Sequence, residues 1–550
     1  MKAGHVQNED GSNYNLDNNT TKDVEPQKIF TEIDKNLDFL KYKYNALICN
    51  DVIIREFSLL AQNIEYKAFV MYIDGMVDSP VINEFILSPL MMRNRANIFD
   101  DKQKKFVSEK KIDNVTLKNF KKSKEKNLVD FIYNSLIPQN SVDKVTDFSD
   151  VYSAINMGNC MLFVDSLDTA FNLDVKGFKQ RNIDSPSNEI VVRGSQEAFV
   201  ENIRTNTSMI RRLVNNENLV METLTVGQIT KTQVSIGYIK SLANEDLVAE
   251  VRYRINNLSV DYLISSGQLE QLIQDSPESL FPQMVATERP DKVSNFLLEG
   301  RVVIVVNGSP YVLVAPGVFV DFITSPEDLN LKYQFSNMQK LIRLIAIFLS
   351  LLLPGMYIAI INYHQELIPT ELLFTIAAAR ESVPFPTFVE ILLMEISFEL
   401  IREAGLRVPT PLGSTIGIVG ALILGEAAVS ASLVSPVLII IIAITGICSF
   451  SIPDFSLNFT FRIYRFIYII LGYVAGFLGI SVVLFIQLVI MCKLKSFGSP
   501  YITPYILNKN KRSISSYFIP PIWKRERTSV FLHAQKKFSQ KKISMVWRKK

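Results

Sequence analysis

The C-terminal two-fifths of this 550-residue chain contains long stretches without a charged side chain. The first of them, Leu344 to Tyr363, would be about 30 Å long as a helix, which is the hydrocarbon thickness of a bilayer. Buried helices of a soluble core are the alternative, but the region has too few charged residues to give each helix a wet face. The sequence therefore predicts an α-helical membrane domain over 336–495, with spans at about 344–363, 409–427, 434–453 and 466–492.

The distribution of cations predicts the orientation of these spans. Lys340 and Arg343 precede the first span, and residues 493–550 hold fifteen Lys or Arg against one acid, Glu526. Lys and Arg favour the cytosolic side, where anionic lipids attract them. The first residues lack the apolar core of a signal peptide. We therefore expect an even number of crossings, both termini in the cytosol, and a basic cytosolic tail over 496–550.

The N-terminal three-fifths has the composition of a soluble, cytosolic part. Strand-like runs alternate with helical spacing, which predicts two α/β or α+β subdomains over 36–145 and 146–335. Residues 1–35 are rich in Asn and Asp, which predicts a disordered tail. The Lys-rich insertion 101–127 is typical of a solvated loop or surface helix. Nucleic-acid binding fits it less well, because acids are interspersed and aromatic residues are sparse.

Residues that carry enzyme chemistry are scarce and far apart. The three histidines are His5, His364 and His533, and the four cysteines form no CxxC pair. This pattern offers no Ser-His or Cys-His nucleophile, no zinc site and no phosphate-binding loop. We therefore expect no cofactor, no metal and no catalytic activity. An intramembrane enzyme would lack the paired groups that it needs.

Two polar clusters in the soluble part are candidate subunit-interface or structural networks. Residues 197–213 have helical spacing, which would place Glu197 and Glu201 one turn apart with Arg204 in reach of Glu201. The cations could contact a partner's acids, or the whole set could be a structural network of salt bridges. The clusters comprise Arg193, Glu197, Glu201, Arg204, Arg211 and Arg212, and Glu288, Arg289 and Asp291.

The stretch 366–407 predicts a broken amphipathic helical hairpin. Prolines interrupt it, and the apolar residues after them recur at helical spacing with acids on another side. The hairpin could lie in the outer interface, or several copies could line a polar vestibule that attracts cations. Glu426, deep in the next apolar stretch, could be functional or could lie near the inner interface. The candidate pore or vestibule residues are Glu395, Glu399, Glu403 and Glu426.

Glycines mark two further features. Gly472 and Gly476 lie four residues apart, a spacing that lets helix backbones approach closely in lipid. In the soluble part, Asn307-Gly308 separates two Val-rich runs, which predicts the tight turn of a β-hairpin.

Several motifs, in order, resemble the A subunit of the GerA family of spore germination receptors over residues 45–505. They are RGSQEAFVENIRTNTSMIRR at 193–212, TERPD at 287–291, EGRVVIVVNGSP at 299–310, SPED at 325–328 and the course from ELIPTELL to GEAAV. Glu426 stands where relatives more often carry an uncharged amide, and Asn307 where an Asp is usual. A role of position 426 in the family is therefore not carried over.

The resemblance implies a nutrient receptor complex in the inner membrane of a bacterial endospore. It implies that this A subunit assembles with a transporter-like B subunit and a lipoprotein C subunit, and that it oligomerises into a channel whose opening begins ion release. A secondary transporter is the alternative, because Pro-broken helices and an embedded acid recur in transporters. Four spans without an internal repeat are few for alternating access.

Overall fold

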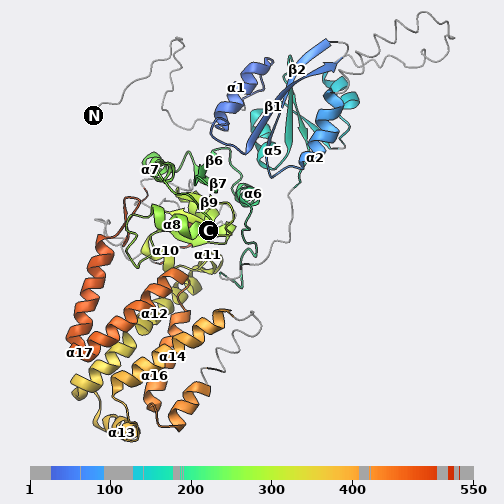
Figure 1. Cartoon of the computed structure of the whole chain (residues 1–550). Coiled ribbons are helices and arrows are strands. Elements are labelled where there is room, and N and C mark those ends of the chain that lie inside the picture. The colour runs from blue at the N-terminus through green and yellow to red at the C-terminus, as the bar shows by residue number, and fades with distance from the viewer. Residues whose placement is uncertain are drawn as a thin grey trace, which may run out of the picture. The chain divides into compact units, whose positions relative to one another are not determined.

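The computed structural model describes two compact units (Figure 1). The residues described are 27–61, 64–91, 128–139, 141–177, 191–407, 423–503 and 518–524, with the single residues 186, 189, 420, 532 and 535. Four predictions fall wholly or largely outside these residues: the disordered tail, the Lys-rich insertion, the span at 409–427 and the basic tail.

The first unit is built on a five-stranded sheet in the order β1-β2-β4-β5-β3. Its elements are the start of α1 (Ile33–Lys43), β1 (Val52–Ala61), β2 (Ile64–Ile73), α2 (Ser79–Val81), η1 (Ile82–Leu87), α4 (Leu128–Phe131), η2 (Ile132–Leu136), β3 (Val142–Val145), α5 (Phe148–Asn156), β4 (Cys160–Val164) and β5 (Ala170–Leu173). Phe69 and Phe163 are cross-strand neighbours with stacked rings 4.7 Å apart. The unit runs to Lys176, beyond the expected boundary near 145, because β4 and β5 complete its sheet.

The second unit contains another five-stranded sheet, in the order β6-β7-β9-β10-β8, with antiparallel neighbours throughout. Its soluble elements are α6 (Ile203–Leu213), β6 (Leu219–Val226), β7 (Thr232–Ile239), α7 (Glu245–Asn256), α8 (Ser266–Ile273), β8 (Val285–Thr287), α9 (Pro290–Leu298), β9 (Val302–Val306), β10 (Val312–Ala315), α10 (Phe319–Ile323) and α11 (Glu327–Asn330). The pairing of β9 with β10 confirms the predicted hairpin around Gly308, whose φ is 88°. The two-sheet part is therefore α+β.

The helical part belongs to the second unit. It comprises α12 (Tyr333–Tyr363), η3 (Gln365–Leu367), α13 (Thr370–Arg380), α14 (Thr387–Arg407), α16 (Pro436–Phe450) and α17 (Phe455–Lys493), followed by the short strands β11 (Lys495–Ser496) and β12 (Ser499–Pro500) and by η5 (Ile522–Lys524). Among the described residues, α12 and α17 are long and apolar enough to cross a membrane, and α16 is apolar but shorter. The chain is thus a membrane protein with at least two candidate spans.

Helix α17 bends back on itself at Gly476, where the backbone has φ 59° and ψ −140°. The Tyr468 hydroxyl donates a 2.7 Å hydrogen bond to Gln487. Nineteen residues apart in a straight helix, these side chains would be separated by about 28 Å. The stretch expected as one span at 466–492 therefore contains a reversal, since glycine adopts a positive φ without the steric cost that a Cβ brings. Figure 1 shows the two arms of α17.

Helices α12 and α17 cross with their backbones in contact at two glycines. A Cβ added at Gly355 would lie 2.8 Å from the Tyr468 carbonyl oxygen, and one added at Gly472 would lie 2.7 Å from the Gly355 carbonyl oxygen. Both distances are shorter than real Cβ contacts. The close approach expected at Gly472 is present, whereas Gly476 forms the bend.

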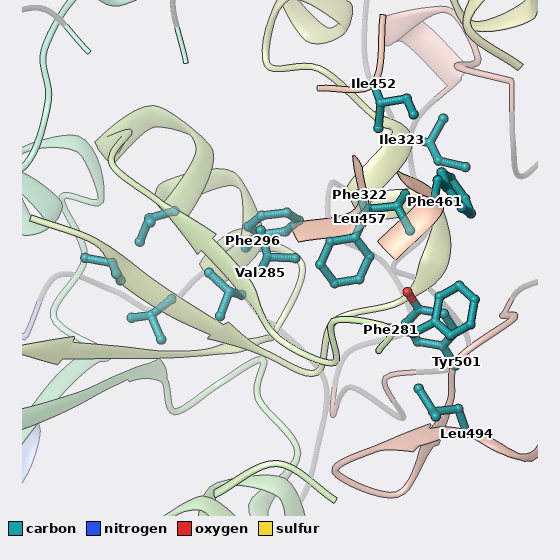
Figure 2. Packing of buried hydrophobic residues seen from close by; sticks show 14 of the residues in the cluster. Phe281, Val285, Phe296, Phe322, Ile323, Ile452, Leu457, Phe461, Leu494 and Tyr501 are labelled. Carbon is teal, nitrogen blue, oxygen red and sulfur yellow. The ribbon is translucent and has the colours of Figure 1, made fainter. Parts of the chain in front are cut away.

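One hydrophobic core joins the second sheet to the membrane helices. Figure 2 shows Phe281 and Phe322 of the soluble part beside Phe461 of α17 and Tyr501, which follows α17. Two hydrogen bonds of the Ser496 hydroxyl reinforce this contact: it donates to the Gln283 carbonyl at 2.5 Å and accepts from the Gly317 amide at 3.2 Å. The segments that precede and follow the membrane helices therefore both pack into the core of the second sheet.

The Gly355–Gly472 crossing predicts a stability loss from a single methyl group. Gly472→Ala should destabilise the protein by about 1–3 kcal/mol, because the helices must move apart. Thermal unfolding in detergent measures this. Gly425→Ala is the matched control, since its Cβ would meet Ile439 at an ordinary 3.6 Å. Equal melting temperatures for the two variants would contradict the crossing.

Candidate functional site

A buried ion pair lies among the apolar helices. Glu395 of α14 is fully buried, and its Oε2 accepts a 2.9 Å hydrogen bond from Nη1 of Arg465 on α17. The Arg465 Nε donates to the Ser350 carbonyl of α12 at 2.8 Å. Ionised side chains inside a helical membrane region are costly unless they are paired in this way. Arg465 therefore ties three helices together.

A second carboxylate extends this network by one helical turn. Glu399 receives a 2.8 Å hydrogen bond from Nη1 of Arg462 and lies 3.7 Å from Nη1 of Arg402. Arg402 also donates to the Ser449 hydroxyl of α16, and its guanidinium lies over the ring of Phe450 at 4.7 Å. The network, defined as Glu395, Glu399, Arg402, Arg462 and Arg465, thus brings α14, α16 and α17 together around two carboxylates and three guanidinium groups.

The four candidate vestibule residues do not share one environment. Glu395 and Glu399 belong to the network, whereas Glu403 and Glu426 are exposed. A second ion pair on α14, missed from the sequence, joins Glu390 to Arg380 at 3.5 Å. The missed arginines of the network had a detectable signal. Arg462 and Arg465 lie three residues apart just before a charge-free stretch, and Glu395 and Glu399 lie four apart, so each pair occupies one face of its helix.

In the first soluble cluster, helix α6 begins later than predicted. Asn202 is its N-cap and accepts hydrogen bonds from the amides of Arg204 and Thr205, at 2.9 and 3.3 Å. Glu197 and Glu201 therefore precede the helix, and the expected helix-face pairing of Glu201 with Arg204 is wrong. Arg204 pairs with Asp74 instead. An N-capping Asn so close to the predicted start is the sequence signal that would have corrected the boundary.

The remaining members of that cluster divide by burial. The Arg211 side chain is buried and binds both oxygens of Asp51, one at 2.8 Å. Arg212 pairs with Glu197 at a half-buried site, whereas Arg193 and Glu201 are exposed. The burial of Arg211 suits a structural bond. The exposed side chains of Arg193 and Glu201 are the ones that a partner could reach.

The second soluble cluster ties down the segment that precedes α6. Arg289 is fully buried and binds Asp291 at 2.8 Å, the Glu189 carbonyl at 3.0 Å and the Ser195 carbonyl at 2.9 Å. Glu288 accepts the Glu189 amide at 2.9 Å. All of these bonds lie within one unit. A guanidinium that makes several hydrogen bonds in a buried site orders the backbone around it.

The network predicts a charge-specific loss of stability. Glu395→Gln should destabilise the helical part by about 3–5 kcal/mol, because Arg465 would lose its hydrogen-bonded carboxylate and keep only that of Glu399, 3.9 Å away. The exchange Glu395→Arg with Arg465→Glu should recover part of that loss. Thermal unfolding in detergent measures both, and an exchange variant that is no more stable than Glu395→Gln would argue against a direct pair.

Glu270, on α8, predicts a pH dependence of stability. Burial, reinforced by the negative charge of Asp454, raises its pKa to about 7 from an ordinary 4.5. Between these values the folded state holds a proton that the unfolded chain has released. The stability from this group is therefore complete below about 4.5 and is lost as the pH rises through about 7.

Glu270→Gln should flatten that dependence, measured as the melting temperature in detergent between pH 5 and pH 8. Glu278→Gln, at an exposed position nearby, serves as the control. If both variants keep the slope of the parent, the buried carboxyl is not its source.

Comparisons with known proteins agree with the resemblance. Residues 38–530 match the family model described as Bacillus/Clostridium GerA spore germination protein. The chain is 37% identical to spore germination protein KA of Bacillus subtilis, over 94% of this chain and 90% of that protein. It is 40% identical to spore germination protein GerLA of Bacillus cereus, over 66% of this chain and 74% of that protein.

A solved structure is also similar: the N-terminal domain of the A subunit of the Bacillus megaterium spore germinant receptor GerK3. It is 29% identical, with a TM-score of 0.37, over 54% of this chain and 99% of that one. Subunits of this kind are not enzymes. The extent of the family match leads to one conclusion: the chain belongs to the GerA family and is an A subunit of a spore germination receptor.

Proposed function

We propose that this A subunit acts in a nutrient receptor complex of the spore inner membrane, and that several copies together form the channel through which ions leave. The observation that carries the channel proposal is the Glu395–Glu399 network between α14 and α17. Glu395 Oε1 and Glu399 Oε1 are buried without a hydrogen-bond partner in the described part of the chain. Carboxylate oxygens in this state favour water or a cation if the helices separate.

The path by which a soluble signal would reach α14 runs through α17. Its first arm contacts the core beneath the second sheet through Tyr464, whose ring lies 5.5 Å from that of Phe281, in the segment before β8. The next residue along the same arm, Arg465, holds Glu395. Movement of this arm against the sheet would therefore act directly on the ion pair. A nutrient bound elsewhere in the complex opens the channel only if it binds the open state more tightly.

The orientation proposed from the sequence has structural support. At its start α12 binds the soluble part through Lys340 and Thr324, 3.1 Å apart. The two ends of α17 reach neighbouring residues of that part, since Thr460 donates to the Leu280 carbonyl and Ser496 to that of Gln283. These ends therefore lie on one side of the apolar helices. We place that side, with both termini, in the spore core.

The proposed complex contains a transporter-like B subunit and a lipoprotein C subunit beside an oligomer of this chain. No nucleic acid and no cofactor is part of it. The exposed pair Arg193 and Glu201 is our candidate for contact with a partner. The buried Arg211 and Arg289 would hold that surface in shape.

The channel proposal predicts altered ion release from a pair of substitutions. Spores carrying Glu395→Gln and Glu399→Gln should release cations at a changed rate after nutrient addition. The rate is compared in spores whose membranes contain the assembled variant at the level of the parent. The substitutions remove the charges that the network balances. Glu371→Gln, an exposed acid at the start of α13, is the control. Unchanged cation release in the double variant, with assembly intact, would count against the vestibule.

A secondary transporter remains the second candidate, favoured by the ion pair of Arg380 with Glu390, which crosses the proline break between α13 and α14. Saturable uptake of a labelled solute by the purified chain in liposomes would support it. Ion conductance without saturable uptake would favour the channel.

A further inference from the structure

On the first three turns of α12, the side that packs against the rest of the protein is polar. Ser336 donates to the Asp328 carbonyl at 2.8 Å, and Arg343 binds the Asp328 carboxylate at 2.8 Å and the Ile323 carbonyl at 2.7 Å. Lys340 is buried beside Thr324. The two cations that precede the first span in the sequence, Lys340 and Arg343, thus point toward the soluble part of the protein and not toward the outer surface of the helix.

The opposite side of the same turns is apolar and exposed. Phe335, Met338, Ile342 and Ile345 recur at spacings of three and four, which puts them on one face. Their exposed fractions lie between 51% and 62%. The face continues without a break to Phe348, inside the predicted span, where it is also half-exposed. A soluble helix would show the reverse arrangement, with its polar side outward.

A segment from the C-terminal region lies against this part of α12. Ile519 exchanges two hydrogen bonds with the Asn337 side chain, at 2.8 and 3.2 Å. Trp523 meets the ring of Tyr333 edge to face, with centroids 6.1 Å apart. Ile522 and Trp523 remain exposed, at 59% and 42%. Residues 518–524, called the strap here, therefore add two large apolar side chains beside Tyr333.

The length of α12 indicates that lipid covers the apolar face of its first turns. Its 31 residues span about 46 Å, which exceeds the hydrocarbon layer of about 30 Å and matches the 40–45 Å of a bilayer with its headgroups. The first turns then fall in the headgroup layer, where Trp and Tyr are enriched. The sequence around the strap is strongly basic, as suits anionic lipid.

We infer that the apolar face of residues 335–345 and the strap together form an anchor that lies in the interfacial layer of a phospholipid bilayer, on the side of the second sheet. This contact is independent of whether the helices conduct ions. It assigns the strap a role as a second membrane attachment, held to α12 by Asn337 and Tyr333. The half-exposed indole of Trp523 would sit at the depth of the headgroups.

The chain has two tryptophans, so Trp547→Phe leaves Trp523 as the single fluorophore. The full-length variant would be reconstituted in nanodiscs of phosphatidylcholine and phosphatidylglycerol, with or without brominated acyl chains. We expect blue-shifted emission, quenching by the brominated lipid and weak quenching by acrylamide. Emission typical of water with strong acrylamide quenching would overturn the anchor. So would blue-shifted emission insensitive to brominated lipid, because protein rather than lipid would then cover the indole.

Two further substitutions, each made in the Trp547→Phe background, test how the strap is held. Asn337→Ala removes both hydrogen bonds to Ile519 and should weaken lipid quenching of Trp523. Ile522→Asp changes an exposed side chain and leaves the core intact. It should lower lipid quenching at least about two-fold, because a carboxylate is costly at that depth. Lipid quenching unchanged by both substitutions would show that the strap does not position Trp523 in the bilayer.

Discussion

The helical part of this protein depends on the bond between Arg465 and Glu395. A guanidinium and a carboxylate that are both buried among apolar helices stabilise each other only when each meets the other at hydrogen-bond distance. Arg465 does this while it also binds the Ser350 carbonyl. The positions of α12, α14 and α17 are therefore interdependent, since any one of them can move only if another supplies a new partner for the charge.

The same dependence explains how far the sequence could be interpreted. Local patterns were informative: the charge-free length of α12 and the Asn307-Gly308 turn each determine an element from neighbouring residues. Patterns did not predict pairings between distant segments. Arg465 and Glu395 are separated by 70 residues, and the sequence around either one does not identify the other as its partner. The acids of α14 could therefore be recognised as unusual, but their partners could not.

Two errors arose where one residue overrides a periodic pattern. The apolar spacing of 197–213 continues through Asn202, yet its side chain caps the first turn, so the helix begins only at Ile203. The apolar run 466–492 likewise continues through Gly476, whose left-handed backbone reverses the chain. Hydrophobic periodicity carries no information about backbone direction. The predicted boundary near 145 failed for a related reason, since β4 and β5 join a sheet begun a hundred residues earlier.

The shared core of the second sheet and α17 bears on the order in which the chain can fold during synthesis. Residues 281–323 leave the ribosome long before Ser496 and Tyr501, which complete the core around Phe281. The strands can pair in the meantime, but the face around Phe281 stays uncovered until α17 has entered the membrane and returned. Correct membrane insertion is thus the last step in completing the core of the second sheet, and a failed insertion would leave an apolar surface exposed on an otherwise formed sheet.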